Sequence, residues 1–181
     1  MKAVYFFQSE DQRFAVTMTA QIVRTMLDEA TRARGAETDG ILVGRYNSRL
    51  NTAVVTGAQP PPADSRGSRL TFERGVSGMR ELLLRLWNGP LRTYYLGEWH
   101  AHPGFNAERS PTDDATMQSR ALREGFNCEV PVLVILGDSG SDWHLQAWVY
   151  REGQAPIPLF EKKSAPEEVQ HDRPQQRINA Q

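Results

Sequence analysis

Apolar residues recur along the chain with two periods, which predict an alternation of strands and helices. Short apolar runs and two-residue alternation predict strands over 3–7, 13–17, 41–44, 52–56, 93–100, 132–136 and 145–150. Apolar residues three and four positions apart predict a helix between Thr19 and Gly35, a second from Val76 to Gly89, and a third over 112–124. This mixed order indicates an α/β fold (mixed α+β) with one mixed sheet packed between helices.

The apolar periodicity stops about twenty residues before the end of the sequence. The length of 181 residues suits one domain and a tail, and we expect the domain to span 1–160. Residues 161–181 are polar and charged, contain two prolines and show no apolar period. Such a segment cannot bury enough apolar surface to offset the entropy of ordering, so it is predicted to be a disordered tail.

Composition narrows the class of protein. Hydrophobic residues make up 39% and charged residues 24% of the chain, as in ordinary soluble proteins. A net charge of -1 gives no overall attraction to nucleic acid or to an anionic membrane. The start of the chain lacks an apolar segment of signal-peptide length, and no apolar run could span a bilayer. A cytoplasmic protein without nucleic-acid or membrane partners is predicted, and the single Cys128 excludes a multi-cysteine zinc site.

A histidine pair near the end of the strand at 93–100 carries candidate chemistry. His100 and His102 are two residues apart, so an extended backbone points both imidazoles to one side. Neutral imidazole is a common zinc ligand, and a carboxylate can complete a three-ligand site with an open fourth position. Glu98 is two residues before His100, so strand alternation points its side chain to the same side as both imidazoles. It could orient an imidazole, contact a substrate or act as a base.

The segment that follows the histidine pair is typical of a helix start. Ser110 is predicted to be the N-cap, Pro111 the first helical residue and Asp113 the reciprocal cap. Asp113 could also supply the carboxylate ligand. The two interpretations are compatible, because a helix start would hold that carboxylate rigidly.

Together these residues form the pattern H-x-H, seven residues, S-x-x-D, which resembles the signature of the JAMM/MPN+ zinc metallopeptidases at every defined position. In that family a glutamate precedes a short apolar strand that ends in glycine, and Glu37 before Gly44 matches this element. Asp39, between them, is expected to be a turn residue. The resemblance implies a JAMM/MPN fold, in which a curved mixed sheet between helices is similar to the cytidine-deaminase arrangement.

The resemblance also implies a role for each residue. His100, His102 and Asp113 would bind Zn²⁺, and Glu37 would be the general base. Ser110 would donate a hydrogen bond to the oxyanion of the tetrahedral intermediate. Glu98 and Phe105 are the candidate substrate contacts.

The substrate class follows from the same resemblance. JAMM enzymes mostly cut after the C-terminal glycine of ubiquitin or a ubiquitin-like protein. A small bacterial member is similar to those encoded beside E1-like and E2-like proteins, including antiphage operons, where it would mature a precursor or release conjugates. The alternatives are a non-catalytic MPN scaffold, and a JAMM peptidase that acts on a sulfur-carrier protein.

Overall fold

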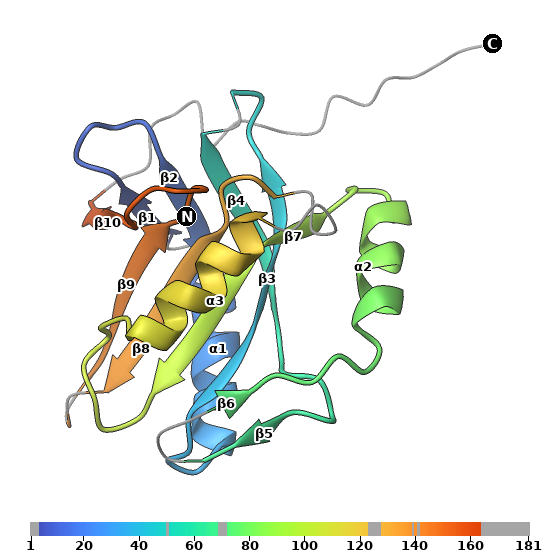
Figure 1. Cartoon of the computed structure of the whole chain (residues 1–181), viewed down its shortest axis with the longest axis vertical. Helices are drawn as coiled ribbons and strands as arrows, with labels where there is room; N and C mark the ends of the chain where they lie inside the picture. Colours follow the sequence, from blue (N-terminus) through green and yellow to red (C-terminus); the bar gives the residue numbers. More distant parts are fainter. Residues whose placement is uncertain are drawn as a thin grey trace.

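The helices and most strands occur in the order that the periodicity predicts, and the described residues add the short strands β5 (Arg66–Gly67) and β6 (Phe72–Glu73) and the strand β10 (Ile157–Lys162) (Figure 1). The computed structural model describes residues 4–49, 51–68, 72–122, 128–138, 140 and 142–163. In chain order the elements are β1 (Val4–Gln8), β2 (Ala15–Thr19), α1 (Ala20–Arg32), β3 (Thr38–Tyr46), β4 (Thr52–Gln59), β5 (Arg66–Gly67), β6 (Phe72–Glu73), α2 (Met79–Asn88), β7 (Tyr94–His102), α3 (Pro111–Leu122), β8 (Val132–Asp138), β9 (Trp143–Val149) and β10 (Ile157–Lys162).

The main sheet is mixed, and it closes on itself. Its strand order is β1-β10-β9-β8-β7-β3-β4-β2, and β1 pairs with both β10 and β2. Strand β7 pairs parallel with β8, and β2 pairs parallel with β4, while the other pairs are antiparallel. The predicted mixed fold is confirmed, but closure was not anticipated. The likeness to a cytidine-deaminase arrangement stays a prediction.

Helices cover both faces of the sheet. Helix α1 packs its apolar stripe, with Met26 fully buried, into the largest core cluster beside Leu42 and Leu96. On the opposite face α3 inserts Met117 against Leu133 of β8, and α2 rests partly buried side chains on β3. Among the described residues, none of the helices combines the length and apolar composition that a membrane span requires.

A bulge in β7 sets which side chains face α2 and α3. Relative to β3 the strand carries one extra residue, Leu96, and the next residue, Gly97, has φ +149°. A Cβ at Gly97 would lie 1.9 Å from the carbonyl oxygen of Val132, so glycine is required there. Alternation restarts after the bulge, which brings Glu98 onto the same face as Tyr95 although they are three residues apart.

Strand β10 was not predicted from the sequence. Pro158 lies inside it, opposite Trp148 of β9, and proline cannot donate a ladder hydrogen bond. The strand tolerates it because β1 pairs with β10 only from Phe160 onward, so Pro158 lacks a neighbour on that side. Strand β10 runs to Lys162, which places the first two residues of the predicted tail in the barrel. Residues 164–181 lie outside the described part of the chain.

Helix α2 departs from the expected inward-facing stripe. It begins at Met79 rather than at Val76, whose side chain is 78% exposed. No α2 residue is fully buried, since its leucines cover the sheet only partly. Helix α2 therefore covers this face of the sheet only in part.

Candidate metal centre

The two histidines at the end of β7 project from the face that α2 and α3 cover. Trp99 and Ala101, which alternate with them, belong to the core cluster on the α1 side. The indole Nε1 of Trp99 donates to the carbonyl oxygen of Gln59 over 3.0 Å, which holds this part of the strand in register. His100 and His102 line one cavity of about 780 Å³, with ring centroids 6.3 Å apart. The predicted shared face is confirmed.

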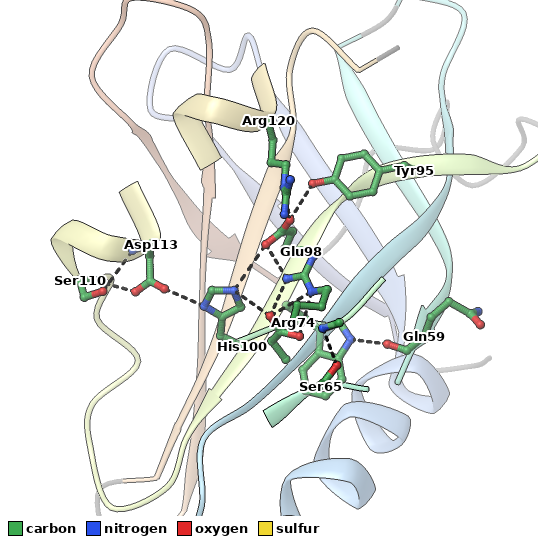
Figure 2. Close-up of polar contacts among 12 residues, drawn as sticks. Gln59, Ser65, Arg74, Tyr95, Glu98, His100, Ser110, Asp113 and Arg120 are labelled. Carbon is green, nitrogen blue, oxygen red and sulfur yellow. Dashed lines mark hydrogen bonds and ion pairs between the residues drawn. The ribbon is translucent and has the colours of Figure 1, made fainter. Parts of the chain in front are cut away.

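The start of α3 supplies a third polar group to this cavity. The predicted reciprocal cap is present: the Ser110 N–H donates to Asp113 Oδ2 over 2.7 Å, and the Asp113 N–H donates to Ser110 Oγ over 3.2 Å. The other carboxylate oxygen, Oδ1, lies 2.7 Å from Nδ1 of His100 (Figure 2). One oxygen of Asp113 thus begins the helix while the other faces the imidazole.

The charge balance of this group favours a bound cation. Burial raises the pKa of Asp113, but hydrogen bonds from His100 and Ser110 outweigh burial and lower it to about 2. Burial lowers the pKa of His100, but the neighbouring carboxylates outweigh it and raise the pKa to about 9. The pKa of His102 is lowered, chiefly by burial, which favours the neutral imidazole that binds metals. The carboxylates around His100 therefore stabilise positive charge at this position, while the imidazole of His102 is kept neutral as a donor.

Three donors are close enough to share one ion. Nitrogen atoms of His100 and His102 and an oxygen of Asp113 lie within 4.8 Å of one another. Two imidazoles and one carboxylate form a donor set found in catalytic zinc sites, in which a fourth position stays open. Of the two ring nitrogens of His100, Nδ1 lies on the side of Asp113, and Nε2 is buried without a hydrogen-bond partner on the other side. These residues fit a zinc ion.

A second acidic group lies behind His100. Asp39, Glu98 and His100 also offer donor atoms within 4.8 Å of one another. Both carboxylates, however, bind the guanidinium of Arg74, at 2.6 Å from each. A carboxylate that already shares its charge with arginine is a poor additional metal ligand, so the set with His102 and Asp113 is the better candidate.

Glu37 reaches the same cavity from another part of the chain. It directly precedes β3, and its backbone N–H donates to the carbonyl oxygen of Ser68 over 2.8 Å. Its half-buried carboxyl lines the cavity together with Ser110 and the three donors. Burial and then the negative charge of Asp113 raise its pKa, against an opposing effect of His100. The structure thus brings this carboxyl into the field of the candidate metal ligands.

The two candidate substrate contacts differ in exposure. The Glu98 side chain is 0% exposed, and its carboxylate binds Arg74 and Arg120. This favours a role beside the imidazole of His100 over direct contact with a substrate. Phe105 is 46% exposed at the cavity wall, where a bound chain could pack against it.

Residues that sequence reasoning missed surround His100. Asp39, expected to be a turn residue, is instead buried in β3 and pairs opposite His100 of β7. Arg74 and Arg120 received no role from the sequence, although both contact Glu98. Their grouping could have been found only from the register of β3 on β7, which places Asp39 opposite His100. No local sequence pattern encodes that register.

Comparisons with known proteins agree with this geometry. The family model for prokaryotic homologs of the JAB domain matches residues 19–150. A CD-NTase/cGAS isopeptidase of Enterobacter hormaechei subsp. hoffmannii is 40% identical over 156 residues, which cover 86% of each chain. A probable metalloprotease, y4qB, of Sinorhizobium fredii is 28% identical over 131 residues, covering 71% of this chain and 79% of the relative.

A solved structure has the same fold. The solution structure of protein DSY2949 from Desulfitobacterium hafniense superimposes with a TM-score of 0.51 at 19% sequence identity. The match covers 85% of this chain and 97% of that one. At this level of identity the likeness extends to the fold alone.

Proposed function

Because this chain belongs to the family of prokaryotic JAB-domain proteins, within the JAMM/MPN+ class, we propose that it is a zinc-dependent isopeptidase. The observation that carries the proposal is the convergence of two imidazoles, the Asp113 carboxylate and the Glu37 carboxyl on one cavity. These groups come from three separate stretches of the chain. A non-catalytic scaffold would not need all of them together.

The proposed chemistry divides between the metal and the protein. His100, His102 and Asp113 would hold the zinc, which supplies Lewis acidity that lowers the pKa of a bound water to about 7. Glu37 accepts a proton from the attacking water and passes it to the leaving amine, so the carboxylate is regenerated in each cycle.

Ser110 can serve both the helix and the reaction. Its Oγ accepts the N–H of Asp113, and accepting leaves the hydroxyl hydrogen for donation. In the proposed reaction that hydrogen is donated to the oxyanion as the tetrahedral intermediate forms. Because the capping hydrogen bond already fixes the Ser110 hydroxyl at the cavity wall, little additional entropy is lost when it binds the oxyanion.

For the substrate we propose an isopeptide or peptide bond after the C-terminal glycine of a ubiquitin-like protein. The cavity has the volume to receive an extended tail, and Phe105 offers apolar surface to it. E1-like and E2-like proteins that attach such a tail are the proposed partners. A relative named as a CD-NTase/cGAS isopeptidase supports an antiphage setting and brings a second candidate substrate, a conjugate of a CD-NTase.

A cleavage assay tests the proposal and separates the two substrates. The zinc-loaded protein is incubated with a ubiquitin-like protein that carries a C-terminal extension, and separately with a CD-NTase conjugate, and the products are weighed by mass spectrometry. We expect cleavage directly after the terminal glycine, and a control in which valine replaces that glycine should stay intact. If zinc-loaded protein leaves both substrates uncut, the proposed substrate class is wrong.

A further inference from the structure

Arg74 lies behind the candidate metal centre, in the segment between β6 and α2 (Figure 2). Its side chain is 10% exposed, and its Nη2 lies 2.6 Å from Asp39 Oδ2 and 2.6 Å from Glu98 Oε2. Its Nε lies 3.0 Å from both oxygens of Asp39. One guanidinium therefore binds two buried carboxylates, which would otherwise repel each other at high cost.

The two oxygens that Arg74 binds are also the ones that face His100. The imidazole Nε2 lies 3.7 Å from Glu98 Oε2 and 3.9 Å from Asp39 Oδ2. This nitrogen is buried and has no partner within hydrogen-bond distance, so these oxygens are its nearby acceptors. On the other side of the ring, Nδ1 faces Asp113. The imidazole of His100 therefore lies between Asp113 on its Nδ1 side and the carboxylates of Asp39 and Glu98 on its Nε2 side.

We propose that Arg74 is a positioning residue for the metal centre: its guanidinium holds Asp39 and Glu98 where they orient the Nε2–H of His100 and leave Nδ1 for the metal. The inference rests on the zinc site of the proposed function. Acceptors for the second nitrogen of a metal-binding histidine fix its tautomer and ring orientation. The hydrogen bonds of Arg74 go to Asp39 and Glu98 rather than to the three metal donors, so it acts through the two carboxylates.

Arg120 of α3 provides a matched control, because it binds the same Glu98 on its other oxygen. Its Nε lies 2.9 Å from Oε1, which also lies 3.2 Å from the Tyr95 hydroxyl. Removing Arg120 takes a cation from Glu98, whereas removing Arg74 takes one from both Asp39 and Glu98. Only the change at Arg74 frees the oxygens that face His100, so the two variants separate positioning from a general loss of buried charge.

The experiment measures metal binding rather than activity alone. Arg74→Gln, Arg74→Lys and Arg120→Gln are titrated with Co²⁺, read by its visible absorption, and with Zn²⁺ in competition with a chromophoric chelator; thermal midpoints and kcat are recorded beside them. We expect Arg74→Gln to weaken zinc binding by about 10- to 100-fold and to alter the cobalt spectrum. Arg74→Lys keeps the positive charge but loses the planar guanidinium, so this variant should fold and bind zinc with an affinity between those of the wild type and Arg74→Gln. Arg120→Gln should lose much less affinity.

Wild-type zinc affinity and cobalt spectrum in every Arg74 variant that folds would overturn the inference. Equal losses in Arg74→Gln and Arg120→Gln, with matching falls in thermal midpoint, would overturn it as well. A wild-type protein that binds neither metal would instead remove the zinc site itself. The failure of the proposed function and the failure of the positioning role are therefore distinguishable.

Discussion

Replacing Glu37 by glutamine should abolish cleavage while zinc stays bound. Glutamine keeps the shape of the side chain but cannot accept the proton of the attacking water. General-base catalysis contributes about 10²- to 10⁴-fold, so kcat should fall by that factor or by more where the proton has no other acceptor. The measurement is kcat on the extended ubiquitin-like substrate, with the zinc content of the same preparation.

The matched control for this change is Glu108→Gln. Glu108 lines the same cavity, but its side chain is exposed and outside the donor set. Its replacement changes the cavity charge by the same amount and should leave kcat near the wild-type value. Retained activity in Glu37→Gln would mean that the proton goes elsewhere. An equal loss in both variants would point to the overall charge of the cavity instead of a base at Glu37.

Replacing His102 by alanine should remove both metal and activity. Three protein ligands are the usual minimum for a catalytic zinc, so a site with two would release its ion on dialysis. His102 is a cleaner target than Asp113, whose carboxylate also accepts the Ser110 N–H at the start of α3, so that its loss would destabilise the helix as well. We expect the zinc content of the dialysed variant to fall to background, and cleavage with it.

The control for the histidine change is His144→Ala. His144 is exposed on β9 and lies outside the cavity lining. That variant should keep its zinc and its activity, because it removes an imidazole without touching the donor set. Stoichiometric zinc in dialysed His102→Ala would show that the ion is held by other groups.

Local rules predicted which of the candidate metal donors share a face or a helical turn, because that placement is set by short-range geometry. The spacing of His100 and His102 puts them on one face of any strand, and the capping pattern of Ser110 and Asp113 works within a single helical turn. Neither rule needs the rest of the fold. The resemblance then joined these stretches to Glu37, and the cavity that all five residues line agrees with that grouping.

Long-range pairing could not be predicted from local patterns. Arg74 meets Asp39 across 35 residues and Glu98 across 24, and these contacts depend on how the segment after β6 folds back over the sheet. The bulge at Gly97, which turns Glu98 toward this cluster, depends on pairing with β3. Closure of the barrel likewise rests on β10, which contains Pro158 and which the apolar periodicity did not predict.

Zinc held by His100, His102 and Asp113 is proposed to be required for cutting the isopeptide bond. The most direct measurement is the cleavage rate of the wild-type protein before metal removal, after removal with a strong chelator, and after zinc is returned in known amounts. We expect loss of cleavage on removal and full recovery when one zinc ion per chain has been added. An undiminished rate in the metal-free protein would contradict it.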